Sequence, residues 1–189
     1  MRRLLILIAI LGCAACMAIG GRANLALQDA AKESKTQPKA VTLGKDSQSD
    51  KYGEVPFNHE NHSTKNYSID GTKPIVCVEC HHTDQPKTAL VAPLKTSERE
   101  VALTAKLLEA ADTKPVKECR ACHLQAGDDS APLPTVTYDG KTTPTKLTNE
   151  VAYHTNCNIC HDKAIAARPA LKGKLAGSND CLVCHKPVS

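Results

Sequence analysis

The stretch Cys77-Val78-Glu79-Cys80-His81-His82 determines what this chain is built to hold. Two cysteines separated by two residues and followed directly by a histidine form the attachment signature of c-type haem. Each sulfur joins one vinyl group of the porphyrin, and the histidine then lies under the iron as its proximal ligand. The pattern returns at residues 119–123, 157–161 and 181–185. Four copies in 189 residues predict four covalently bound haem c groups, attached through Cys77, Cys80, Cys119, Cys122, Cys157, Cys160, Cys181 and Cys184.

Paired cysteines also build zinc sites, and eight thiolates could form two four-cysteine centres. The histidine that follows every pair would then have no role. Disulfides or redox-active dithiols leave the same residue unexplained. Haem attachment is therefore the favoured interpretation.

The histidine count predicts the axial ligands. The chain has eight histidines, of which four are proximal and four remain for the opposite side of the irons. The competing ligand, methionine, occurs only as Met1 and Met17, inside a predicted leader. Bis-histidine coordination without methionine favours a low reduction potential. The predicted iron ligands are His59, His62, His81, His82, His123, His154, His161 and His185.

The first 23 residues have the pattern of an export signal. Arg2 and Arg3 precede an apolar run over residues 4–11, and small residues follow up to Ala23. We therefore expect a signal peptide over residues 1–23 and a periplasmic protein. A lipid anchor at Cys13 is the alternative processing. Residues 24–50 are rich in polar residues and predict a flexible N-terminal arm, followed by a haem-bearing domain over residues 51–189.

The composition predicts a fold that depends on its cofactors. The chain has no tryptophan and one phenylalanine, so aromatic side chains supply little core. We expect a mostly α protein with much irregular chain and a short N-terminal β element at residues 41–43, wrapped around four haems. Ser97-Glu98-Arg99-Glu100 has the form of a capping box and predicts a helix over residues 97–111. A second helix is expected from Thr148 through His154.

Charge disfavours nucleic acid as a partner. Removal of the leader takes away Arg2, Arg3 and Arg22, which leaves 21 of the 24 basic residues against 20 acidic ones. Haem propionates would then make the holoprotein net acidic.

The segment Phe57-Asn58-His59-Glu60-Asn61-His62, followed by the double histidine at residues 81–82, resembles the class III cytochromes c, that is, tetrahaem cytochrome c3. The resemblance covers about residues 52–189, and the long insertion over residues 84–118 is more similar to the acidic type II branch. It implies axial pairing of His59 with His81, His82 with His123, His62 with His161, and His154 with His185.

Six-coordinate iron has no open position for a substrate, which favours an electron carrier over an enzyme. The resemblance implies transfer between a hydrogenase or similar donor and a membrane redox complex in anaerobic respiration. It also implies a docking face near the fourth haem, where Lys163, Arg168, Lys172, Lys174 and Lys186 gather in the sequence. A multihaem reductase with an open haem site and an extracellular filament subunit remain as alternatives.

Overall fold

The structure is a computed structural model that describes residues 33–45, 47, 51–137 and 142–187. All four haem motifs and all eight histidines lie within these ranges, and residues 33–189 belong to one compact unit. The predicted signal peptide and Cys13 lie outside them. Among the described residues, no helix has the length and apolar character needed to cross a membrane.

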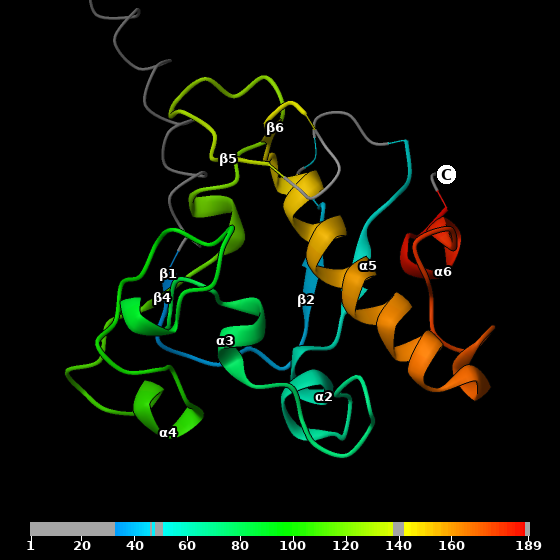
Figure 1. Ribbon diagram of the computed structural model, residues 1–189, viewed down its shortest axis with the longest axis horizontal. Coiled ribbons are helices and arrows are strands. Elements are labelled where there is room, and N and C mark those ends of the chain that lie inside the picture. Colours follow the sequence, from blue (N-terminus) through cyan, green and yellow to red (C-terminus); the bar gives the residue numbers. More distant parts are fainter. Residues whose placement is uncertain (1–32, 46, 48–50, 138–141, 188–189) are drawn as a thin grey trace, which may run out of the picture. The chain divides into compact units, whose positions relative to one another are not determined.

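The helices are short except for one. Helix α5 has 19 residues and crosses the unit diagonally, with α3 and α2 on one side and α6 on the other (Figure 1). The chain is thus a small fold of few helices, short strands and much irregular backbone, less helical than predicted. The helices are α2 His59–Thr64, α3 Cys77–Cys80, α4 Ala105–Leu108, α5 Asn149–Ala167 and α6 Cys181–Cys184, with 3-10 turns η1 Lys87–Ala89, η2 Cys119–Ala121 and η3 Pro169–Leu171.

In the described part of the chain, the strands form three antiparallel pairs. Strand β2 Val41–Leu43 pairs with β3 Val55–Phe57, which places Val41 opposite Phe57. Strand β1 Glu33–Ser34 pairs with β4 Val116–Lys117, and β5 Thr135–Val136 pairs with β6 Thr145–Lys146. The predicted strand at residues 41–43 is confirmed. Strand pairing also ties residues 33–43, part of the predicted arm, to the haem-bearing part of the chain.

The two histidine-bearing helices begin at side-chain caps. Asn58 Oδ1 accepts from the backbone N–H of Asn61 at 2.8 Å and opens α2, which carries His59 and His62 on one turn. Thr148 Oγ1 accepts from the N–H of Val151 at 3.3 Å and opens α5, as predicted. Each cap satisfies a backbone donor that the first turn leaves free, so the cap residue sets where the helix begins.

The predicted helix over residues 97–111 is wrong. Only α4 forms there, capped by Thr104. The Ser97 hydroxyl donates to the Gln85 carbonyl at 2.6 Å and does not cap a helix. The segment runs back along residues 83–85 in a non-helical conformation, through bonds from Glu98 N–H to the Thr83 carbonyl and from Leu103 N–H to the Asp84 carbonyl, and Arg99 pairs with Asp84. Tertiary hydrogen bonds have overridden the local capping signal.

Few apolar side chains are buried. The buried hydrophobic residues among those described are Leu103, Leu124, Val136, Ala164 and Ala176, and no large side chain in this part of the chain is less than 2 % exposed. Polar groups accompany them, including His123 at 8 % and Asp84 at 3 % exposure. A protein-only core of this size is small for a domain, and His123 is the one histidine buried in it among the described residues.

Candidate haem-ligand sites

Three of the four histidine pairs expected from the resemblance lie opposite each other across short gaps, with their rings steeply inclined. The ring centroids of His59 and His81 are 6.3 Å apart, and the rings are inclined by 63°. The corresponding values are 6.1 Å and 60° for His82 and His123. For His154 and His185 they are 6.1 Å and 71°. Each pair joins residues from separate segments of the chain.

These spacings fit two imidazoles on opposite sides of one metal ion. A metal–imidazole nitrogen bond is about 2.0–2.1 Å and the ring centroid lies about 1.1 Å further back, so trans rings have centroids about 6.2 Å apart. Edge-to-face aromatic contacts also have centroids about 4.5–7 Å apart, so the cysteine pair beside each gap is what distinguishes these sites. The donor set present, two imidazoles per gap beside a pair of cysteines, therefore fits a covalently attached haem.

The fourth expected pair is not formed in this way. His62 contacts Phe57, with ring centroids 4.6 Å apart, and Tyr67 at 5.4 Å. No ring pair joins His62 to His161 within the described ranges. The Nδ1 atom of His161 instead bonds the Ala176 carbonyl at 2.9 Å, which holds this proximal histidine to the loop after η3. The roles of His62 and His161 as partners stay a prediction.

Backbone carbonyls fix the tautomer of several rings. His123 Nδ1 bonds the Leu147 carbonyl at 3.0 Å, His185 Nδ1 that of Gly53 at 2.7 Å, and His62 Nδ1 that of Asn58 at 2.8 Å. Since a carbonyl can only accept, Nδ1 must carry the proton, and in the neutral ring Nε2 keeps its lone pair. Hydrogen bonds of this kind orient metal-binding histidines and raise their basicity.

Burial favours the neutral, metal-binding form of other rings. Burial is the main cause that lowers the pKa of His81 and His82, whereas the Asp84 charge raises both in part. Burial also lowers the pKa of His59, against a smaller opposite effect of the Pro38 backbone. An imidazole must lose its second proton before it can bind iron, so these shifts keep the rings in the required state at neutral pH.

The cysteine pairs lie on single helical turns. Three begin α3, η2 and α6, and Cys157 and Cys160 lie within α5. Helical spacing places residues i and i+3 on the same side, so both sulfurs of a pair face one way. The histidine N–H closes the turn onto the first cysteine, as for His81 to Cys77 at 2.8 Å. Within the described residues, the eight cysteines of the four motifs form no disulfide, which leaves their sulfurs available for thioether bonds.

Sequence reasoning missed the groups that hold these rings. The carbonyls of Gly53, Leu147 and Ala176 carry no signal in the sequence, because any residue offers a backbone oxygen. It also missed the buried ion pair between Asp84 and Arg99. Asp84 does have a sequence signal: it is an acidic residue two positions after the double histidine.

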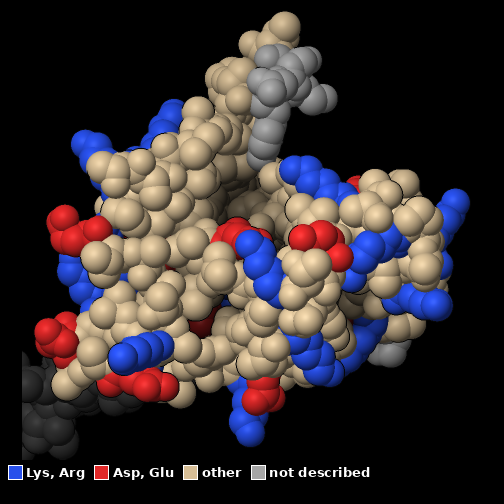
Figure 2. Space-filling model, turned by 60° about the horizontal axis from the view of Figure 1, so that its bottom comes forward, with Lys and Arg blue, Asp and Glu red and all other residues tan. Residues whose placement is uncertain are grey.

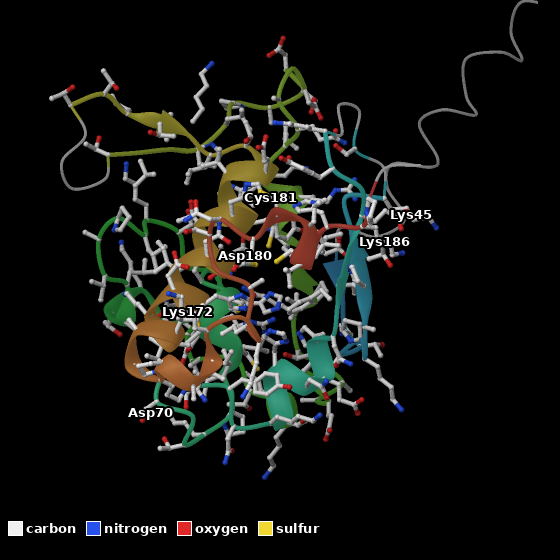
Figure 3. The ribbon with its side chains drawn as sticks, turned by 90° about the vertical axis from the view of Figure 1, so that its right-hand side faces the viewer. Lys45, Asp70, Lys172, Asp180, Cys181 and Lys186 are labelled. Atoms are coloured by element: carbon white, nitrogen blue, oxygen red, sulfur yellow. The ribbon has the colours of Figure 1, made fainter. Side chains whose placement is uncertain are left out.

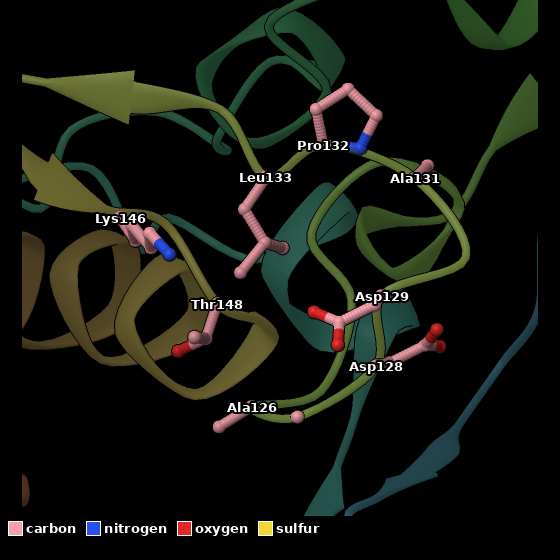
Figure 4. Close-up of a pocket in the computed structure, with 9 residues that line it drawn as sticks. Ala126, Asp128, Asp129, Ala131, Pro132, Leu133, Lys146 and Thr148 are labelled. Atoms are coloured by element: carbon pink, nitrogen blue, oxygen red, sulfur yellow. The ribbon is translucent and has the colours of Figure 1, made fainter.

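A shallow cavity of about 310 Å³ lies apart from the histidine pairs, and none of the sixteen predicted haem residues lines it. In Figure 4 the Asp129 carboxylate turns toward Leu133 and Thr148, whereas Asp128 turns to the other side. The Leu147 carbonyl, flanked by the lining residues Lys146 and Thr148, accepts from His123. The loop over residues 126–133 thus packs next to the support of this histidine.

Basic side chains gather near the last motif. In the space-filling view they lie mainly toward the right, where Figure 1 places the end of α5 and α6 (Figure 2). Lys172 and Lys186 lie on opposite sides of Cys181 and Asp180 (Figure 3). Two of the five predicted docking cations have protein partners. Arg168 donates to the Ile69 and Ser68 carbonyls at 3.0 and 3.1 Å, and Lys186 to Glu54 at 3.3 Å.

Comparison with known proteins identifies one related family. A family model described as "Class III cytochrome C family" matches residues 30–146, more than half of the chain. The matched region contains the first two haem motifs and the paired histidines of α2. No curated protein and no solved structure matches the chain.

Proposed function

The chain belongs to the class III cytochrome c family, and from this premise we propose that it is a periplasmic tetrahaem carrier of electrons at low potential. The family accounts for covalently bound haem and multihaem electron transfer. The number of haems, the periplasmic location and the role in anaerobic respiration are the parts that we propose. They rest on the four attachment motifs and on the export signal of residues 1–23.

The observation that carries the proposal is the set of three imidazole pairs with centroids 6.1–6.3 Å apart. When bound, each haem iron supplies one-electron chemistry between its ferric and ferrous states. Two histidines per iron leave no position for a substrate, so the sites support outer-sphere transfer. We extend this coordination to His62 and His161, which complete the count of eight.

The chain's own residues hold the rings in place. Carbonyl bonds to Nδ1 fix the orientation of His123 and His185, and burial keeps His81 and His82 neutral. Pre-set ligands need little rearrangement when the iron changes its charge. Electron transfer is fast when the protein site rearranges little between the two charge states.

We propose that the partners are a hydrogenase or similar donor and a membrane redox complex. Redox partners of this kind use small, transient interfaces in which complementary charge orients the encounter. The exposed cations Lys172 and Lys174, on the loop before the fourth motif, suit an acidic partner. Nucleic acid is not expected, because the holoprotein is net acidic.

The test uses holoprotein secreted by a host that attaches c-type haem. Its denatured mass should exceed that of the mature chain by four haem masses. Low-temperature EPR of the oxidised protein should show low-spin ferric signals alone, since every iron has two strong-field imidazoles.

Three haems or fewer would contradict the ligand count. A high-spin ferric signal would indicate an open iron and favour the reductase alternative. The control is Lys65→Met, which adds a methionine on an exposed position and should leave mass gain and spin state unchanged.

A further inference from the structure

The buried ion pair of Asp84 and Arg99 lies next to the double histidine of the first motif. Both side chains are almost wholly inaccessible, at 4 % and 6 % exposure. Asp84 lies two residues after His82, and its N–H bonds the His81 carbonyl at 2.9 Å. His81 and His82 belong to two different imidazole pairs, so one carboxylate adjoins the ligand sets of two irons.

The guanidinium has further partners in residues 113–115. Arg99 uses Nε for Asp84 and turns its terminal nitrogens to Thr113 Oγ1 at 3.3 Å, the Lys114 carbonyl at 2.9 Å and the Pro115 carbonyl at 3.4 Å. The second carboxylate oxygen, Oδ2 of Asp84, is buried and has no hydrogen-bond partner. The ion pair therefore leaves one buried carboxylate oxygen without a donor.

The Asp84 charge acts on both ligand histidines. It raises the pKa of His81 and of His82 against the larger effect of burial. The same carboxylate adds to the effect of burial in raising the pKa of Cys77. A carboxylate that stabilises a positive imidazole also stabilises any added positive charge at the same place.

Anchoring the insertion does not require this ion pair. Backbone bonds already join the insertion to residues 83–85, from Glu98 N–H to the Thr83 carbonyl and from Leu103 N–H to the Asp84 carbonyl, both at 2.8 Å. Ser97 adds a bond to the Gln85 carbonyl. Replacing a buried ion pair by apolar residues is often neutral or stabilising, so stability alone explains it poorly.

We propose that Asp84 is an electrostatic positioning residue that lowers the reduction potentials of the two irons ligated through His81 and His82, and that Arg99 moderates its effect. The inference rests on the proposed bis-histidine haems. The ferric site carries one more positive charge than the ferrous site, and a nearby buried carboxylate stabilises the ferric form. Low dielectric makes this effect larger than for a surface charge.

The experiment compares two variants that should shift the reduction potentials in opposite directions. Asp84→Asn keeps the shape and removes the charge. It should shift the ferric–ferrous equilibrium about tenfold toward ferrous at these two haems, which is about 59 mV upward for one electron. Arg99→Gln leaves the carboxylate without its cation and should lower the same two potentials. Haem-resolved redox titration of the holoprotein at one pH, followed by NMR, gives each potential.

Glu98→Gln is the matched control, because it breaks the more exposed ion pair with Lys117 in the same segment, at 2.7 Å. It should leave all four potentials unchanged. The proposal would be overturned if both variants shifted the potentials in the same direction. Equal shifts of potential at all four haems, or no shift at all, would also overturn it. If Asp84→Asn does not fold, Arg99→Gln and the charge-retaining Asp84→Glu remain. The potentials of Asp84→Glu should stay close to those of the wild type. Haem count and spin state of the wild type are measured first, so failure of the proposed function is recognised separately.

Discussion

The first and the last haem motif of this chain lie in different surroundings. Beyond His81 and His82 the chain enters a buried polar network, in which Asp84 is 3 % exposed. In the last motif the two residues between the cysteines, Leu182 and Val183, are 63 % and 70 % exposed. Glu79 in the attachment turn of the first motif is exposed as well, so the two regions differ chiefly in the buried ion pair that follows His81 and His82.

The contrast separates two tasks of an electron carrier. Buried charges act strongly on the potential of a nearby iron, because little solvent screens them. An exposed attachment turn brings the edge of a bound haem within reach of a partner. We infer that the first region sets potentials and that the last region exchanges electrons. The predictions below test this division, from the largest expected effect to the smallest.

The largest change should follow from exchanging a ligand in the buried region. His82→Met replaces imidazole by thioether and should raise the potential of one haem by on the order of 0.1 V, within the range of about 0.8 V that axial ligands control. His154→Met makes the same exchange at a half-exposed ring, with a side chain 51 % exposed. It should raise the reduction potential of a different haem. Spectroelectrochemical titration measures both.

Unchanged titration curves for His82→Met would mean that His82 is not a ligand. If both variants raised the potential of the same haem, the two histidine pairs with centroids 6.1 Å apart would not correspond to separate irons.

The ligand set stays a prediction, and it rests on covalent chemistry that fixes the spacing of each motif. The motif needs its histidine directly after the second cysteine, and a count of eight then assigns the remaining rings. The start of α5 at Thr148 was predicted and is confirmed, because this cap acts within one turn. A local signal of this kind holds only where tertiary contacts do not compete with it.

Long-range contacts were not predictable. Ser97 and Arg99 read locally as the start of a helix, yet their side chains bond Gln85 and Asp84 across 12 and 15 residues. The carbonyl of Gly53 supports His185 from 132 residues away. Such contacts depend on where the chain is folded, and a backbone oxygen has no sequence signature.

The next largest effect should come from the contact that holds the exposed region. Gly53 N–H bonds the Lys186 carbonyl at 2.8 Å, and a Cβ at this position would lie 2.6 Å from that oxygen. Gly53→Ala should therefore displace the last motif and lower the free energy of unfolding by about 1–3 kcal/mol. Urea unfolding of the holoprotein measures the change.

The spectrum of one haem should alter, while the haems near His81 and His82 keep their potentials. Tyr52→Phe is the control, because it keeps the ring against His185 at 5.7 Å and should change little. If Gly53→Ala changed the potentials of the haems near His81 and His82 equally, the two regions would not be independent.

A smaller effect concerns the rate of partner encounter. Lys172 and Lys174 are exposed beside the last motif, and reversing both to glutamate should slow reduction by an acidic donor about tenfold at low salt, with little change in potential. Stopped-flow reduction at several salt concentrations measures the rate. Salt should also slow the wild type, since a Debye length of about 8 Å at physiological ionic strength screens steering.

Reversal of Lys95 and Lys106 is the matched control, because it changes the net charge equally at two exposed positions of the insertion. If this control slowed the reaction and the first variant did not, the docking face would lie on the insertion. The inference that the last motif exchanges electrons with partners would then be wrong.

The smallest effect concerns the turn that joins the end of α5 to the chain ahead of the first motif. Asp70 accepts from Ser68 Oγ at 2.6 Å and from Thr72 N–H at 3.1 Å and Thr72 Oγ1 at 2.9 Å. These bonds, the Ser68 hydroxyl first, lower the pKa of Asp70 from 3.8 to about 2. Arg168 holds the same turn through the Ile69 and Ser68 carbonyls.

Because the folded pKa of Asp70 is depressed, its contribution to stability is complete above about pH 4 and is lost as the pH falls toward 2. Asp70→Asn should remove this part of the acid sensitivity, so its melting temperature should fall less than that of the wild type between pH 5 and pH 2. The difference should be small, because Asp70 is exposed and solvent screens its charge. Asp112→Asn, at another exposed position, should follow the wild type. Parallel curves for Asp70→Asn and wild type would show that this turn does not couple the two regions through Asp70.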